Sequence, residues 1–302
     1  METLADIRLF VEAATVGGLA AAGRRLELSP ATASTRLAKL EATLQVRLFD
    51  RTTRRLRLTE EGSLYLAHCR EMLSSLEAAH AALQAGRGSV RGDLRVSATV
   101  DFGQNVLRQW LDEFNRKHPD VRQRLLLSDT LASVSRDDVD VAIRFGAPPD
   151  GALVARRLAE NQRVLCAAPR YLASQGEPAH PRELALHRCI SQTASAHAAG
   201  SWTLRSGRET FTSELVRANA RHTDSGAVAR LWALDGHGIV LKAEWDVRDD
   251  LRRGRLRRVL PAWRGPDATI HALYRSNRYA LPRVRAFLDF LVQRFAAAAP
   301  GT

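Results

Sequence analysis

Residues 17–41 constrain the fold most, because they combine two helical segments with a tight turn between them. Residues 20–25 are rich in alanine and arginine, which have high helix propensity. Ser29 and Pro30 then offer a side-chain cap and a proline at the first helical position, where a missing N–H costs nothing. A second helix is therefore predicted from Pro30 to about Leu44. One buried face is formed by residues three or four positions apart: Ala33, Leu37, Leu40 and Leu44.

The opposite face of this predicted helix carries small, hydroxyl and basic side chains: Ala31, Thr32, Ser34, Thr35, Arg36 and Lys39. Small residues let a helix enter the major groove of DNA, while hydroxyl and basic groups reach bases or phosphates. The pattern thus indicates a DNA-reading helix-turn-helix. The alternative is an ordinary two-helix corner with a solvated polar face.

Residues 48–59 favour the first of these interpretations. They hold four arginines within seven positions, and Leu56, Arg57 and Leu58 alternate as in a short two-stranded wing. Together with residues 20–26, 29–34, 40–41 and 49–62, this segment resembles the N-terminal winged helix-turn-helix of LysR-type transcriptional regulators. We expect base contacts from Ser34, Thr35 and Arg36, and phosphate contacts from Arg51, Arg54 and Arg55. The full predicted DNA-binding set is Arg24, Pro30, Ala31, Thr32, Ser34, Thr35, Arg36, Lys39, Arg51, Thr52, Thr53, Arg54 and Arg55.

The net charge of +12 suits a polyanionic partner, but only three of the 45 basic residues are lysines, which is typical of a general composition bias. The placement of the arginines therefore indicates DNA more strongly than the net charge does. The three cysteines fit reduced thiols, and no segment has the length of a membrane span or the pattern of a signal peptide. These features predict a cytoplasmic protein with no membrane partner.

A long helix is expected after the wing, capped by Thr59 with Glu60 and Glu61 in its first turn. A seam with a heptad-like spacing follows: Leu66, Cys69, Leu73, Leu76, His80 and Leu83. Such a seam predicts pairing with a second copy of the chain, giving a homodimer or homotetramer. The alternative is a helix that packs on its own domain. Residues 86–92 are glycine-rich and are interpreted as a hinge, because no Gly-Lys-Ser/Thr follows that would make a phosphate loop.

From Asp93 the pattern changes to alternating strands and helices, which predicts an α/β domain with parallel sheets. Strands are expected at 94–100, 121–127 and 139–144, with helices at 106–114 and 131–136. A second series begins near Arg163, and a last strand (269–274) and helix (281–295) are expected to return to the first lobe. The predicted domains are 1–58 (winged helix-turn-helix), 59–91 (linker helix and hinge) and 92–302 (effector domain). Lobe I spans about 92–161 and 267–302, and lobe II about 162–266.

The second half also resembles the LysR-type family, namely its periplasmic-binding-protein-like effector domain. The matching stretches include residues 92–97, 114–121, 140–146, 153–158, 236–239 and 250–256. The resemblance therefore covers the chain and implies a multidomain regulator: an all-α winged helix-turn-helix with a long linker helix, then a two-lobed α/β domain.

A ligand cleft is expected where strand ends of neighbouring βα units converge. The predicted effector-binding residues lie there, and the resemblance adds a turn from the second lobe: Ser97, Thr99, Ser128, Asp129, Thr130, Arg144, Thr223, Asp224 and Ser225. Arg144 would bind a carboxylate, which predicts an anionic effector. Its alternative is a salt bridge to a nearby acid; with Asp129 as that acid, the effector could be neutral or cationic.

Two function classes fit such a chain: a DNA-binding regulator that senses a small molecule, and an enzyme or solute-binding protein whose N-terminal helices only pack or dimerise. The segment 222–225 holds the residue types of a hydrolase triad, but adjacent residues rarely converge on one reacting atom, and a helix start explains them better. No histidine or cysteine pair has the spacing of a zinc site. We therefore expect no catalytic residue, metal or cofactor, and a regulator whose partners are double-stranded DNA, a small effector and itself.

Overall fold

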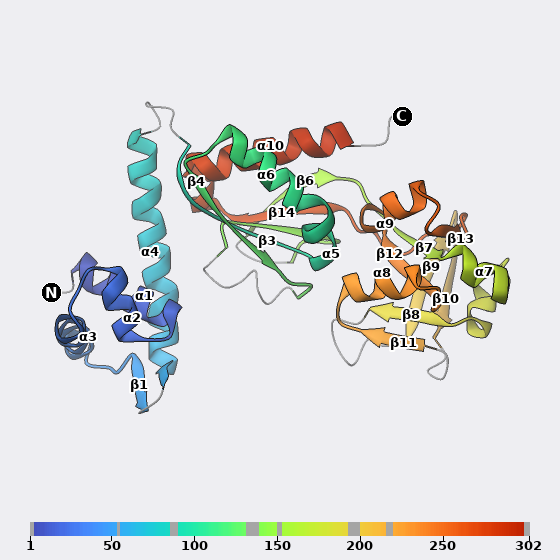
Figure 1. The fold of residues 1–302 in the computed structure, drawn as a ribbon. Helices are drawn as coiled ribbons and strands as arrows, with labels where there is room; N and C mark the ends of the chain where they lie inside the picture. Colours follow the sequence, from blue (N-terminus) through green and yellow to red (C-terminus); the bar gives the residue numbers. More distant parts are fainter. Residues whose placement is uncertain are drawn as a thin grey trace. The chain divides into compact units, whose positions relative to one another are not determined.

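The computed structural model describes residues 3–52, 55–84, 90–130, 139–149, 153–192, 200–215 and 220–298. The chain divides into two compact units, Met1–Gly86 and Arg87–Thr302, and each is described by itself (Figure 1). Within the described residues, no helix is long and apolar enough to cross a membrane.

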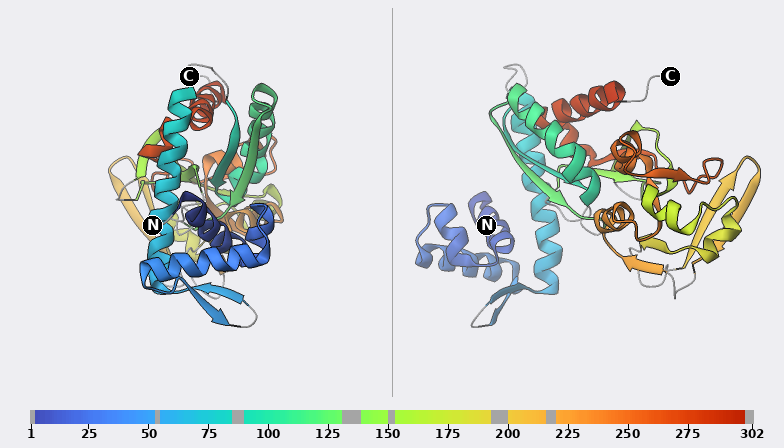
Figure 2. Two further views of the ribbon diagram at one scale, coloured as in Figure 1. Left: turned by 90° about the vertical axis from the view of Figure 1, so that its left-hand side faces the viewer. Right: turned by 45° about the vertical axis from the view of Figure 1, so that its right-hand side comes forward.

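The first unit starts with three helices, α1 (Leu4–Val16), α2 (Leu19–Arg25) and α3 (Pro30–Leu44). The predicted cap of α3 is confirmed, since the Ser29 hydroxyl accepts a hydrogen bond from the Thr32 amide at 3.1 Å. The predicted wing is also confirmed. Strands β1 (Phe49–Thr52) and β2 (Arg55–Leu58) pair antiparallel and extend from the helices as a ribbon (Figure 2).

Helix α4 (Glu60–Gln84) follows the wing, and the Thr59 hydroxyl caps it by accepting from the Gly62 amide at 2.9 Å. At Gly62, helix α4 packs closely against the backbone of Leu48, which directly precedes the wing. A Cβ atom at this position would lie 2.0 Å from the Leu48 carbonyl oxygen, so only glycine fits. The core of the unit is formed by apolar residues of all four helices and the wing: Leu9, Phe10, Ala13, Ala22, Ala33, Leu37, Leu40, Leu48, Phe49, Leu66 and Cys69.

Lobe I of the second unit is built on a sheet whose described strands follow the order β4-β3-β5-β14-β6. Their bounds are β3 (Gly92–Ala98), β4 (Val121–Leu127), β5 (Val141–Phe145), β6 (Leu153–Ala159) and β14 (Ile270–Arg275). The helical segments are α5 (Val100–Phe102), the π-helical η2 (Gly103–Leu107), α6 (Arg108–Lys117), the 3-10 helix η6 (Ser276–Ala280) and α10 (Pro282–Ala298). Helices α6 and α10 lie side by side over this sheet, and Phe114 of α6 contacts Phe287 and Phe290 of α10 (Figure 1).

Lobe II holds a second sheet, whose described strands follow the order β11-β8-β12-β7-β13. Its strands are β7 (Arg163–Ala167), β8 (Cys189–Gln192), β11 (Ala220–Thr223), β12 (Ile239–Ala243) and β13 (Arg257–Val259). Its helices are α7 (Pro169–Gln175), the 3-10 helix η4 (Pro181–Leu186), α8 (Gly226–Leu234) and α9 (Glu244–Arg252). A separate hairpin joins β9 (Ser201–Ser206) to β10 (Glu209–Glu214).

The two lobes are joined by two chain crossings and by an aromatic contact. Asn161, on the first crossing, donates to the Ala268 carbonyl of the second at 3.0 Å and accepts from the Trp245 amide at 3.2 Å. The Trp245 ring of α9 packs on Phe102 and Phe295 of lobe I, with ring centroids 6.5 Å and 4.9 Å apart. The lobes therefore have a fixed point of contact beside the crossings.

Two predictions from the sequence need correction. Neither sheet is wholly parallel, because β14 pairs antiparallel with β5 and β6, and β7 pairs antiparallel with β12 and β13. The predicted strand through Val100 ends at Ala98, and Val100 starts a helix instead. The return of the last strand and helix to lobe I is confirmed. The helix expected at 131–136 lies outside the described residues.

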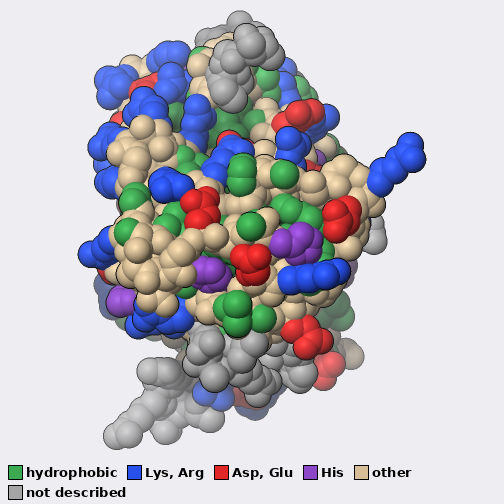
Figure 3. Space-filling model, turned by 90° about the vertical axis from the view of Figure 1, so that its right-hand side faces the viewer, with side chains coloured by type: hydrophobic (Ala, Val, Ile, Leu, Met, Phe, Trp, Pro, Cys, Tyr) green, Lys and Arg blue, Asp and Glu red, His purple; other side chains and the backbone are tan. Residues whose placement is uncertain are grey.

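On the face of the molecule in Figure 3, basic side chains are interspersed with acidic and histidine side chains. Ion pairs between such side chains occur on the surface of lobe II, where Asp249 pairs with Arg252 and Arg253. Arginines thus also occur in lobe II, where they pair with acidic side chains, so they are not confined to the predicted DNA-binding residues.

Candidate functional site

Helix α3 presents the predicted DNA-reading face to solvent. Arg36 is half-buried, with its Nε atom 3.9 Å from Asp6 Oδ1. The Thr35 hydroxyl donates to the Ala31 carbonyl at 3.0 Å, which leaves its oxygen able to accept. The other predicted residues of α2 and α3 are exposed: Arg24, Pro30, Ala31, Thr32, Ser34, Thr35 and Lys39.

The arginine-rich wing, formed by β1 and β2, follows helix α3 in the chain. Arg51 and Thr52 belong to β1 and Arg55 to β2, so the backbone brings these three residues to the end of the ribbon. Their side chains are not described, and Thr53 and Arg54 lie outside the described residues.

The residues of the predicted seam on α4 do not share one environment in the structure. Leu66 and Cys69 are 7% and 3% exposed and belong to the core of their own unit, and Leu73 packs against that core. For these residues the alternative of packing on their own domain holds, because their side of α4 faces α1. Leu76 is half-buried, and the side chains of His80 and Leu83 are not described. Two apolar residues outside the predicted seam are instead exposed on α4, Leu64 at 65% and Met72 at 43%.

Ser97 and Arg144 meet at the carboxyl ends of β3 and β5. An Arg144 guanidinium nitrogen donates to Ser97 Oγ at 2.7 Å, and another donates to the Ile143 carbonyl at 2.8 Å. Burial lowers the pKa of Arg144 to about 10, while the nearby Asp129 carboxylate opposes that shift. Since this pKa is still well above neutrality, Arg144 carries its charge inside the domain.

Asp129 links the two lobes through both carboxylate oxygens. One oxygen accepts from the Val100 amide at the start of α5 at 2.9 Å, and the other accepts from the Gly226 amide at the start of α8 at 2.7 Å. Its carboxylate therefore lies at the N-termini of one helix from each lobe, which backbone N–H groups make favourable for an anion. Ser128 and Thr130, on either side, bond to each other through their hydroxyls at 3.0 Å.

The turn from lobe II starts helix α8, as the helix-cap interpretation of residues 222–225 predicted. Ser225 caps the helix by accepting from the Val228 amide at 3.4 Å, and the Thr223 hydroxyl accepts from the Ser225 amide at 3.1 Å. Asp224 is exposed. These side chains support the turn, and the Gly226 amide is the group that reaches Asp129.

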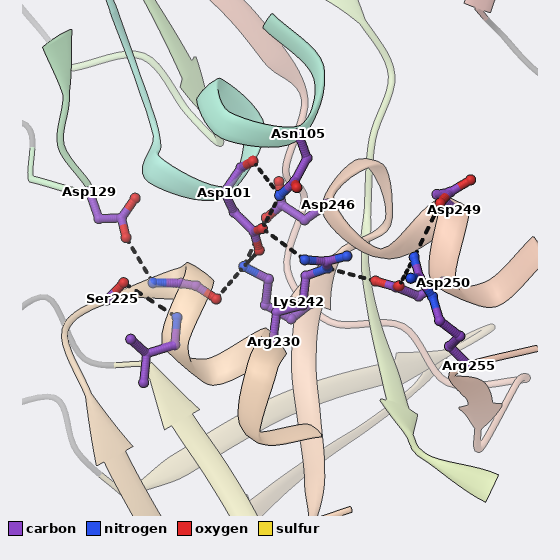
Figure 4. A network of polar contacts seen from close by, with 12 residues as sticks. Asp101, Asn105, Asp129, Ser225, Arg230, Lys242, Asp246, Asp249, Asp250 and Arg255 are labelled. Atoms are coloured by element: carbon purple, nitrogen blue, oxygen red, sulfur yellow. Dashed lines mark hydrogen bonds and ion pairs between the residues drawn. The ribbon is translucent and has the colours of Figure 1, made fainter. Parts of the chain in front are cut away.

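A network of charged side chains between the lobes was missed by the sequence analysis (Figure 4). Lys242 of β12, 2% exposed, lies 2.9 Å from Asp101 Oδ2 and 2.9 Å from Asp246 Oδ2. Arg230 of α8 lies 2.6 Å from Asp250 and 3.7 Å from Asp101. The sequence offered one signal for this network, a lysine between apolar neighbours in a predicted strand of a chain that has few lysines. A lysine in such a position is expected to be buried, and a buried ammonium needs a partner of opposite charge.

Burial raises the pKa of Asp101 to about 6, although Lys242 and Arg230 oppose the shift. Burial alone would lower the pKa of Lys242, but the carboxylates of Asp246 and Asp101 raise it above its usual value. The ammonium therefore stays charged between two carboxylates, of which Asp101 ionises less readily than a carboxyl in water.

A cavity of about 170 Å³ lies among these groups. Its wall includes predicted effector residues (Thr99, Asp129, Arg144) and members of the missed network (Asp101, Lys242, Asp246). The hydroxyl oxygen of Thr99 is buried without a hydrogen-bond partner among the described residues. The cavity therefore offers charges of both signs and an unmatched hydroxyl to a small polar molecule.

A larger hollow of about 770 Å³ lies beside the chain crossings, where Asn161, Gln162, Asp267 and His271 contribute to its wall. None of the predicted effector residues lines it. The smaller cavity is thus the one that brings the predicted strand ends together.

Comparisons with known proteins agree with both units. Residues 4–63 match the model of the bacterial regulatory helix-turn-helix proteins of the lysR family, and residues 87–296 match the LysR substrate binding domain. The chain is 34% identical over 297 residues to an HTH-type transcriptional regulator of Xanthomonas campestris, covering 96% of this chain and 85% of the relative. It is 34% identical over 293 residues to the HTH-type transcriptional regulator DmlR of Escherichia coli, covering 97% and 94%.

Among solved structures, CrgA, a LysR-type transcriptional regulator from Neisseria meningitidis, matches with a TM-score of 0.63 and 29% identity, over 96% of this chain and 98% of that one. This match confirms the predicted fold class, a helix-turn-helix domain followed by a two-lobed α/β domain. The chain therefore belongs to the LysR family of transcriptional regulators, DNA-binding proteins that carry an effector-binding domain and are not enzymes.

Proposed function

We propose that this regulator reads promoter DNA with helix α3 and holds the phosphate backbone with its wing. The exposed small and hydroxyl side chains of α3 support this, since they let the helix approach base edges. In a footprinting and salt-titration experiment, Arg36→Ala should cost about 1–3 kcal/mol at its operator and relax the preference at one or two positions. Arg54→Ala should weaken all sequences similarly and reduce the salt dependence by about one unit. Equal binding of specific and random duplexes by the intact protein would contradict the proposal.

We further propose that the regulator acts as a homodimer or homotetramer paired through α4, in the cytoplasm. The exposed apolar residues Leu64 and Met72 support pairing, because apolar side chains of one helix are buried most readily against a second copy. The double variant Leu64→Asp and Met72→Asp spares the core of the unit and should sediment as a monomer. A correctly folded variant with the oligomeric state of the wild type would exclude this face of α4.

The third part of the proposal concerns the effector, which we propose to be a small organic anion bound in the cavity between the lobes. The charge of Arg144 and the unmatched Thr99 hydroxyl in the wall of this cavity support it. A thermal-shift screen of small organic acids is the first experiment. For an acid that binds, calorimetry on Arg144→Ala and Thr99→Val should show reduced affinity, while DNA binding without the acid persists. Unchanged affinity in both variants would exclude the site.

A further inference from the structure

The side chain of Lys242 lies at the boundary of lobe II that faces lobe I (Figure 4). Its ammonium donates to the Gly226 carbonyl at 3.1 Å and contacts two carboxylates, Asp246 of its own lobe and Asp101 of lobe I. The ammonium therefore has one hydrogen bond and two ion pairs, and together these contacts restrain the Lys242 side chain.

Asp101 reaches this place from α5 in lobe I, across the boundary between the lobes. The Asn105 amide of its own lobe donates to one of its carboxylate oxygens at 2.9 Å, and the other oxygen faces Lys242. Arg230 Nη1 lies 3.7 Å from the oxygen that Asn105 binds. One carboxylate of lobe I thus sits between two cations of lobe II.

Both cations keep a carboxylate from their own lobe. Lys242 has Asp246 at 2.9 Å, and Arg230 has Asp250 at 2.6 Å. If the Asp101 carboxylate left, neither cation would become a lone buried charge, which is the change that costs most in an ion-pair network. Asp101 is therefore the carboxylate of this network that another carboxylate can replace with the least loss of ion pairing.

The same groups are open to a small molecule, because Asp101, Asp246 and Lys242 all line the cavity of about 170 Å³ that also holds Thr99 and Arg144. A molecule in this cavity would therefore lie against the ammonium and against both of the carboxylates that pair with it. Asp250, in contrast, has no exposed surface and does not line the cavity.

We propose that Lys242, in the wall of the cavity, forms a carboxylate-binding site, and that Asp101 occupies this site whenever no effector carboxylate does. Arg230 does not line the cavity and adds its positive charge from behind Asp101, at 3.7 Å. This inference rests on the proposed function, since it names the chemical group that the cavity would recognise. Exchange of Asp101 for a free carboxylate would remove a contact between the lobes, which gives the effector the differential interaction that any change of conformation requires.

Chemical rescue tests this site directly. Asp101→Ala removes a carboxylate, and formate is the matching free anion. We expect formate to raise the thermal midpoint of the full-length Asp101→Ala variant by several degrees, through preferential binding to the folded state. Formate should stabilise the wild type much less than the variant, because it must compete with Asp101 for the same cation, and uncharged formamide should have no effect on the variant. All five tryptophans lie in the second unit, so tryptophan fluorescence reports its unfolding.

Two matched variants identify the site. Asp250→Ala also removes a carboxylate from Arg230, but outside the cavity, so formate should not stabilise it. The double variant Asp101→Ala, Lys242→Met lacks the ammonium and should not respond either. No stabilisation of Asp101→Ala by formate, or equal stabilisation of either matched variant, would overturn the proposal. These outcomes involve neither DNA nor the effector, so they are separable from a failure of the proposed function.

If Asp101→Ala does not fold, Asp101→Asn keeps the side-chain shape and removes the charge. Spin labels at exposed Gln109 of α6 and Gln175 of α7 report the distance between the lobes, and the native cysteines are buried. With labelled protein diluted into an excess of unlabelled protein, we expect Asp101→Asn to shift this distance towards longer values. Asp250→Asn, which breaks no contact between the lobes, should match the wild type. An unshifted Asp101→Asn would refute the place of Asp101 between the lobes.

Discussion

Replacing Lys242 with methionine tests how far the second unit depends on one buried charge. Methionine keeps much of the length and apolar volume of the lysine side chain but removes the ammonium. Asp101 and Asp246, both now 2.9 Å from that ammonium, would face each other without it. We expect the variant to fold and to be less stable than the wild type, more so at higher pH.

The size of the effect follows from the two contacts. At an effective dielectric constant of about 20, charges 2.9 Å apart attract by roughly 6 kcal/mol. Protonation of one carboxyl limits the loss, so the expected cost is about 3–5 kcal/mol, as for other buried pairs that lose one partner.

The sign of the pH dependence is set by Asp101. Its pKa is already raised from 3.8 to about 6 by burial, so the folded state holds its proton longer than the unfolded state. Stability from this group therefore falls as pH rises from about 4 to 6, by about 3 kcal/mol in the wild type. Without Lys242 the pKa rises further, and the fall extends to higher pH.

Urea unfolding at pH 5.5 and 7.5, followed by tryptophan fluorescence, measures both effects. Lys117→Met is the matched control, because Lys117 is exposed and its ammonium lies 5.4 Å above the Phe290 ring. That control should cost no more than about 1 kcal/mol. If Lys242→Met costs the same as the control, or costs equally at both pH values, the reasoning on this network is refuted.

Three further variants test other parts of the structure. Ser29→Ala removes the cap of α3 and should cost about 1 kcal/mol, seen as faster hydrogen exchange in the first turn of that helix; unchanged exchange would contradict it. Gly62→Ala places a Cβ atom against the Leu48 carbonyl, so it should destabilise the first unit by about 1–3 kcal/mol. Circular-dichroism melts measure this loss, and a wild-type midpoint would show that the close packing at Gly62 does not require glycine. Asp129→Asn replaces one of two oxygens that accept from backbone amides with a donor, so it should lower the free energy of unfolding of the second unit by about 1–3 kcal/mol in urea. Ser128→Ala should be near neutral, and equal losses in both variants would refute the link that Asp129 makes between the lobes.

Short-range features could be predicted from the sequence because their causes act over a few residues. Ser29 and Pro30 start α3 wherever the rest of the chain lies, since the cap bond spans only three residues. The alternation around Arg57 likewise predicted the wing, and Thr59 predicted the start of α4. The convergence of Ser97 and Arg144 followed from a general property of strands in one sheet.

The tertiary structure decided which side of each element is covered, and with which partner. The spacing of Leu66 and Cys69 fits a helix pair as well as a domain core, and only the position of α1 shows that these residues belong to the core. Strand β14 runs antiparallel because the chain returns to lobe I from lobe II, a route that no local pattern encodes. Lys242 and Asp101 are distant in the sequence and lie in different lobes, so their ion pair exists only because folding brings a buried cation and a buried carboxylate to the same boundary.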